Sequence, residues 1–228
     1  MKRYRWLTAK WPVSMRLLAK RLKVRNFTDQ LSEGFVIDRV RDDYLEARFI
    51  ERIEYDDTVT DPFGKELSFH RVEYKQCEFR ASMEGPGLEL IDAPRAVQGL
   101  ISRLAEATDF GLAISPLTVN ALAWAKGVQR HLNAGGIVDS LQIGSVELAP
   151  GISAKMLVRG EADVLAESNR LIEGRKHVIE KVQLKLPGAL RTTIVLASSG
   201  SVRIDHEAPS DDTLASVRAS LLEQLVKA

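Results

Sequence analysis

Two long segments in which apolar and polar residues alternate, 44–55 and 67–81, constrain the fold of this chain most strongly. They flank the sequence Asp61-Pro62-Phe63-Gly64, which is typical of a tight turn. In the first segment the apolar residues occupy odd-numbered positions: Leu45, Ala47, Phe49, Ile53 and Tyr55. This period of two is typical of a half-buried strand, so the sequence predicts a long hairpin. In the second segment the apolar residues switch between odd and even positions, from Leu67 and Phe69 to Val72 and Tyr74, and then to Cys77 and Phe79. Each switch predicts a β-bulge.

The rest of the chain separates into blocks of helices and blocks of strands. Apolar residues at helical spacing predict four helices, at about 15–24, 97–104, 117–132 and 211–225. Ser14, Asp92 and Ser210 are the expected N-caps of three of them. Alternation returns over 141–158 and 178–204, whereas 161–176 is compatible with either a short helix or a loop.

Separate blocks of this kind predict an α+β fold, with largely antiparallel twisted sheets and long hairpins packed by about four helices. We expect an N-terminal part, residues 1–134, with a strand, the hairpin and two helices. A β-meander with a C-terminal helix is expected over 135–228, within one continuous globular unit.

Charge is distributed very unevenly along the chain. Residues 1–28 contain nine basic and no acidic side chains. The remainder has 32 − 9 = 23 basic and 31 acidic residues, so a segment of +9 precedes a body of −8. Such asymmetry indicates either an anionic partner for the basic end or docking of that end onto the protein's own acidic body.

Basic side chains recur in the N-terminal strand, in the helix 15–24 and in the alternating segment 178–204. In each of them they lie on a face that the apolar residues leave free. The helix 15–24 has a basic stripe beside an apolar stripe that consists of Met15, Leu18, Ala19 and Leu22. The nine candidate nucleic-acid-binding residues are Arg3, Arg5, Arg16, Lys20, Lys23, Lys181, Lys185, Arg191 and Arg203. Because cations near phosphates supply affinity without reading sequence, the pattern favours an accessory protein that binds the backbone of DNA or RNA. Three aromatic residues near the N-terminus are candidates for stacking on bases or for the core: Tyr4, Trp6 and Trp11.

Two other functions compete with this interpretation. The chain is also compatible with a protein-interaction subunit of a larger assembly, or with a homo-oligomer. The triplet Glu73-Tyr74-Lys75, which follows Asp56, Asp57 and Asp61, is similar to the motif of PD-(D/E)xK nucleases. In those enzymes carboxylates hold Mg²⁺ and the lysine positions the attacking water. The predicted turn places Glu73 opposite Ile50, about 20 Å from Asp56, which disfavours the nuclease interpretation.

Other signatures of chemistry are missing from the sequence. The four histidines show no metal-ligand spacing, and no phosphate-binding loop or nucleophile elbow occurs. We therefore expect no metal and no cofactor, and we lean against an enzyme. No apolar run approaches the length of a membrane span, and a single cysteine fits a reducing compartment, so we expect a cytoplasmic protein without a membrane partner. A mitochondrial transit segment is the alternative for the basic N-terminus. Cys77 and Trp124 are predicted to be buried.

Overall fold

The computed structural model describes residues 1–187, 192–205 and 211–226. The chain forms two compact units, each with its own core. The inserted unit is residues 9–113, and the discontinuous unit combines residues 1–8 with 114–228. The first strand, β1 (Lys2–Lys10), runs across the boundary between them. The predicted division at residue 134 stays a prediction.

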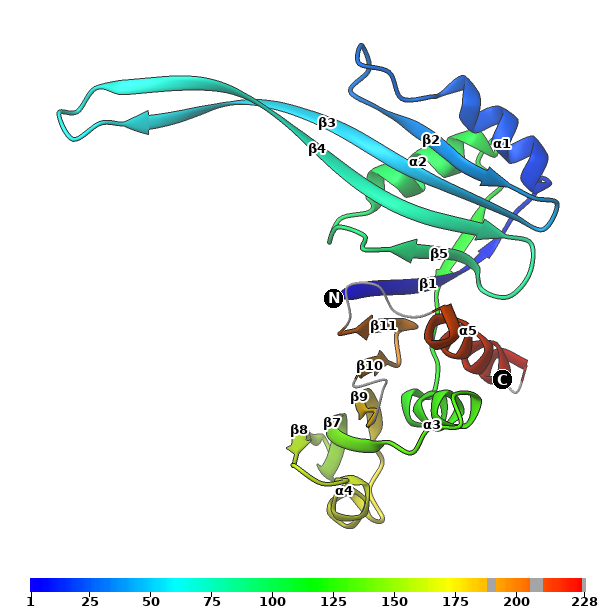
Figure 1. The fold of residues 1–228 in the computed structure, drawn as a ribbon. Coiled ribbons are helices and arrows are strands. Elements are labelled where there is room, and N and C mark those ends of the chain that lie inside the picture. Colours follow the sequence, from blue (N-terminus) through cyan, green and yellow to red (C-terminus); the bar gives the residue numbers. More distant parts are fainter. Residues whose placement is uncertain (188–191, 206–210, 227–228) are drawn as a thin grey trace. The chain divides into compact units, whose positions relative to one another are not determined.

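The inserted unit is an antiparallel sheet covered by two helices. Its strands follow the order β2 (Glu33–Val40), β3 (Tyr44–Thr60), β4 (Glu66–Ser82) and β5 (Gly87–Ile91). Both helices, α1 (Met15–Val24) and α2 (Gln98–Ala107), lie on the same side of this sheet (Figure 1). Figure 1 also shows the β3–β4 hairpin extending well beyond its neighbours.

Helix α1 follows the sequence prediction closely. The hydroxyl of Ser14 accepts a hydrogen bond from the amide of Leu17 at 3.3 Å, as expected of an N-cap. The buried residues are those of the predicted apolar stripe: Met15, Leu18, Ala19 and Leu22. The N-cap predicted for α2 is wrong. Asp92 adopts a left-handed φ of 46° directly after β5, six residues before α2 begins at Gln98.

The hairpin contains no bulge between its two long strands. Its register runs without a shift from Tyr44 opposite Ser82 to Thr60 opposite Glu66, so the predicted bulges are wrong. The distal part of the hairpin is exposed on both faces, and no core there requires one parity to be apolar. Apolar residues therefore change face along β4 although the strand pairing stays regular.

Aromatic side chains form the centre of the inserted unit. The Phe35 ring lies 5.1 Å from that of Phe49 and 6.1 Å from that of Phe79, measured between ring centroids. Each of the three is at most 2% exposed. Cys77 lies opposite Phe49 across the β3–β4 pair and is also buried, as the sequence predicted.

We expect the thiol of Cys77 to react very slowly in the native protein. Burial, with smaller contributions from Glu51 and Glu78, raises its pKa to about 12. Since the thiolate is the reactive form, labelling by a thiol reagent at pH 8 should require unfolding. The measurement is the labelling rate with and without denaturant. Rapid labelling of the native protein would contradict this expectation.

The discontinuous unit is also an antiparallel sheet with helices. Residues Lys2 to Arg5 of β1 pair with β11 (Ser201–Ile204). The order continues through β10 (Thr193–Ala197), β9 (Val178–Lys185), β7 (Ile137–Ala149) and β8 (Ile152–Arg159). Strand β6 (Ala113–Pro116) carries the chain back into this unit. Helix α3 (Ala121–His131) packs on β9, β10 and α5 (Asp211–Val226). The ambiguous segment contains a helix, α4 (Leu165–Ile172). Ser210, the expected cap of α5, lies outside the described residues.

Two tryptophans pack in the core of the discontinuous unit. The indoles of Trp6 and Trp124 meet edge to face at a centroid distance of 5.8 Å. The Nε1 of Trp124 donates a hydrogen bond to the carbonyl of Val217 at 3.0 Å, which joins α3 to α5. Tyr4 stacks on Trp6 and is buried as well, so neither ring is available to stack on a base. Trp11, in the inserted unit, is buried and donates to the carbonyl of Gly87.

These elements confirm the predicted α+β fold with antiparallel sheets and a long hairpin. The described residues contain five helices instead of about four, because α4 is added to those that the periodicity predicts. None of these helices combines the length and the apolarity that a membrane crossing requires.

Candidate nucleic-acid interface

Five of the nine predicted residues lie on one exposed sheet surface of the discontinuous unit. This surface, called the basic face below, is formed by Arg3, Arg5, Lys181, Lys185 and Arg203. The strands that carry them, β1, β11 and β9, bury their alternate residues, including Tyr4, Val202 and Val182. The period-two pattern thus separates an apolar side from a cationic side, as the sequence predicted for β9 and β11.

Strand register determines how these cations are arranged. Arg3 lies directly opposite Arg203, and β10 separates Arg203 from β9. On β10, Thr193 lies opposite Lys185 and Val195 lies opposite Arg203. Neighbouring strands are about 4.8 Å apart, so two cationic rows flank a neutral strand at a separation of about 10 Å.

Placing two arginines directly opposite each other has an energetic cost. Like charges in a cross-strand pair repel, so Arg3 and Arg203 both add positive potential at the same point of the sheet. The cationic rows therefore form a surface that favours a ligand with several negative charges.

Carboxylates beside the basic face are engaged in local contacts. Glu180 accepts from Lys155 at 2.6 Å, and this contact, together with a hydrogen bond from Gln142, lowers the pKa of the Glu180 carboxyl. Asp139 accepts a hydrogen bond from the Gln183 amide at 3.2 Å through Oδ2, whereas its Oδ1 is buried without a hydrogen-bond partner among the described residues. Glu180 therefore remains ionised at neutral pH and holds Lys155 beside β9.

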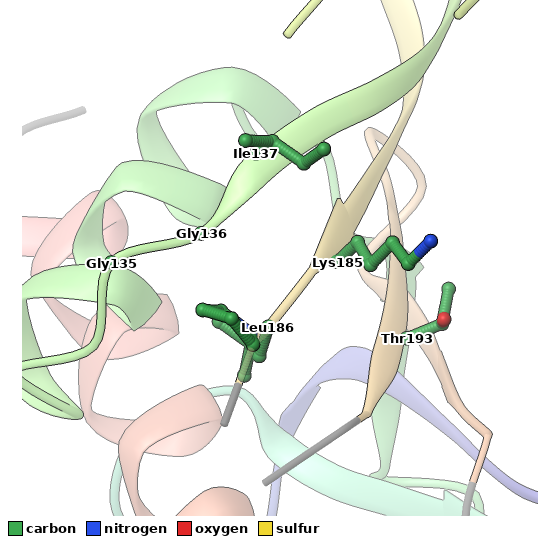
Figure 2. A pocket seen from close by; sticks show the side chains of 7 residues that line it. Gly135, Gly136, Ile137, Lys185, Leu186 and Thr193 are labelled. Atoms are coloured by element: carbon green, nitrogen blue, oxygen red, sulfur yellow. The ribbon is translucent and has the colours of Figure 1, made fainter. Parts of the chain in front are cut away.

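A pocket of about 550 Å³ opens at one end of the basic face (Figure 2). Figure 2 shows Lys185 and Thr193 on adjacent strands, Ile137 on the strand that pairs with Lys185, and Leu186 directly after Lys185. Gly135, Gly136 and Pro187 complete the lining. The pocket combines apolar walls with one cation and one hydroxyl, which suits a ligand that has both an anionic and an apolar part.

Of the other four candidates, the three that the structure describes lie outside the basic face. Arg191 is outside the described residues. The stripe of Arg16, Lys20 and Lys23 belongs to α1 of the inserted unit. Arg16 forms an ion pair with Asp42, an acidic residue of the same unit. Within the described ranges, no ion pair involves Lys20 or Lys23, and both side chains are exposed.

Part of the N-terminal positive charge is used inside the inserted unit. Arg21 pairs with Asp109 at 2.7 Å and donates to the carbonyl of Ala107. Arg25 pairs with Glu106, and the hydrogen bond from Arg25 is the main cause of a lowered pKa of the Glu106 carboxyl. Docking on the protein's own acidic residues therefore accounts for some of this charge.

The residues of the nuclease-like motif do not converge. The hairpin register puts Ile53, and not Ile50, opposite Glu73, so Asp56 is about 10 Å away along the strand instead of about 20 Å. Asp56 pairs with His70 and has the parity opposite to that of Glu73, which places the two carboxylates on different faces of the hairpin. In the part of the chain that the structure describes, no group of three His, Cys, Asp or Glu side chains is arranged to hold a metal.

Comparison with known proteins does not assign this chain to a family. No protein-family model and no curated protein matches it.

Sequence patterns gave no indication of two features of this interface. The pocket lining comes from three separate segments, 135–137, 185–187 and Thr193, none of which has a distinctive motif. The alignment of Arg3 with Arg203 requires the pairing of β1 with β11, whose residues are about 200 positions apart in the sequence. The sequence offered a single indication of this arrangement. In both strands, the arginines alternate with the apolar residues and therefore lie on the opposite face.

Proposed function

We propose that this protein is a nucleic-acid-binding accessory protein whose basic face contacts the phosphates of DNA or RNA. The observation that carries the proposal is the assembly of five cations, from strands at the two ends of the chain, on one exposed surface. Lys and Arg side chains that neutralise phosphates release condensed counterions, and this release supplies affinity without base recognition. Lys20 and Lys23 of α1 are proposed as a second set of contacts.

The pocket beside Lys185 supports this function. A nucleotide presents a phosphate next to a largely apolar base, and the pocket presents a cation next to apolar walls. We place the activity in the cytoplasm, since the single cysteine is a buried free thiol and suits a reducing compartment.

A salt titration tests the proposal. Binding of labelled 20-nucleotide single strands and duplexes is measured over a range of salt concentrations, for the wild type and for a face variant with Lys181→Glu, Lys185→Glu and Arg203→Glu. We expect wild-type affinity to fall steeply with salt. The face variant should lose affinity, and its slope of log affinity against log salt should decrease by about 2–3 for three lost contacts.

The matched control changes the same amount of charge elsewhere. Lys126→Glu, Arg95→Glu and Arg170→Glu replace three exposed cations outside the basic face. This control variant should keep a steep slope. The proposal is wrong if the wild type binds neither probe at low salt, or if the face and control variants lose the same affinity.

The double substitution Lys20→Glu and Lys23→Glu tests the contribution of α1. Folding should be unchanged, because exposed charges contribute little to stability. The salt slope should decrease by no more than about 2, corresponding to two contacts. An unchanged slope would remove α1 from the interface and leave the basic face as the binding surface.

A further inference from the structure

The distal part of the β3–β4 hairpin, residues 53–73, is a two-stranded ribbon that we call the arm. The pairing of β2 with β3 reaches no farther than Glu33 opposite Glu51. The pairing of β5 with β4 reaches no farther than Ile91 opposite Glu78. Beyond these positions β3 and β4 pair only with each other among the described residues. Figure 1 shows the arm extending away from the two helices of the inserted unit.

The arm exposes large apolar side chains on one face. Tyr55, Val59, Leu67 and Phe69 share a parity, and Val59 lies opposite Leu67. All four are between 40% and 50% exposed, and Phe63 at the tip is 95% exposed. An isolated two-stranded ribbon is marginally stable in water, and a contiguous apolar surface of this kind is typical of an interaction site.

The charge of the arm argues against nucleic acid as its partner. Residues 53–73 contain six acidic and two basic side chains, so 2 − 6 = −4. The six acids are Glu54, Asp56, Asp57, Asp61, Glu66 and Glu73. Phosphates would be repelled, whereas a cationic surface with a neutral centre would be attracted.

We propose that the arm docks on the basic face of a second copy of this chain. The basic face presents five cations around the neutral side chains of Thr193 and Val195. The arm presents apolar side chains at its centre with Glu73 on the same face, where Asp57 is paired with Arg71 at 3.0 Å. Apolar contact at the middle and opposite charges at the rim are the usual composition of a protein interface. Two arms facing each other would instead bring together charges of −4 and −4.

This association does not depend on nucleic-acid binding, and it is tested in its absence. Sedimentation velocity over a wide range of protein concentrations is measured for the wild type, the face variant and an arm variant. The arm variant carries Val59→Thr, Leu67→Thr and Phe69→Thr, which remove apolar surface while retaining residues that favour strands. We expect the wild type to associate, with weaker association at high salt, and each variant to remain monomeric.

A mixture of the two variants provides the decisive measurement. The face variant has an intact arm and the arm variant has an intact basic face, so an equimolar mixture should form a heterodimer. The charge-matched control variant should associate like the wild type. The arm variant should also keep the salt slope of nucleic-acid binding, so a failure of this inference is distinguishable from a failure of the proposed function. The inference is overturned if the wild type is monomeric throughout, if the face variant still self-associates, or if the mixture stays monomeric.

Discussion

Replacement of Trp124 by alanine should destabilise the discontinuous unit by about 3–5 kcal/mol. The indole is 0% exposed, meets Trp6 edge to face and donates to the carbonyl of Val217. Alanine would leave a cavity in the core between α3 and α5, and it would also leave a buried carbonyl without its donor. The free energy of unfolding, measured by circular dichroism in urea, checks this prediction.

Two further substitutions identify the cause of that loss. Trp124→Phe retains an aromatic ring without the indole donor, so its effect should be smaller than that of alanine. Lys126→Ala lies on the same helix and is exposed, and it should change stability by less than about 0.5 kcal/mol. A loss below about 1 kcal/mol for Trp124→Ala would place this residue outside the core.

Replacement of Phe49 by alanine should destabilise the inserted unit by a similar amount, about 3–5 kcal/mol. Phe49 is 2% exposed, lies 5.1 Å from the ring of Phe35 and faces Cys77 across the strand pair. The cavity would lie beside α2, where Gly99 approaches the ring of Phe49. The measurement is urea unfolding, followed together with the labelling rate of Cys77, because loss of this core should expose the thiol.

Tyr55→Ala is the matched control on the same strand. Tyr55 belongs to the arm and is 44% exposed, so its removal should cost much less than the removal of Phe49. If both substitutions had equal effects, the core of the inserted unit would not be centred on the three phenylalanines.

Local signals in the sequence were sufficient for several elements. Ser14 followed by an apolar stripe predicted the start and the buried face of α1, because a cap and a 3.6-residue period act within one element. Where the environment was not local, the predictions were wrong. The parity changes in β4 indicated bulges only on the assumption that one face was buried, and the arm has no buried face.

Sequence patterns alone predicted the α+β class, the long hairpin, the core positions of Cys77 and Trp124, and the cationic parity of β9 and β11. These properties follow from periodicity, which is a property of neighbouring residues. The folded chain was needed to establish that Arg3 lies opposite Arg203, that Arg16 pairs with Asp42, and that Asp56 and Glu73 occupy different faces. Each of these facts depends on strand register or on the packing of segments distant in the sequence. Long-range pairing is selected by the burial of the whole core, and no local pattern specifies it.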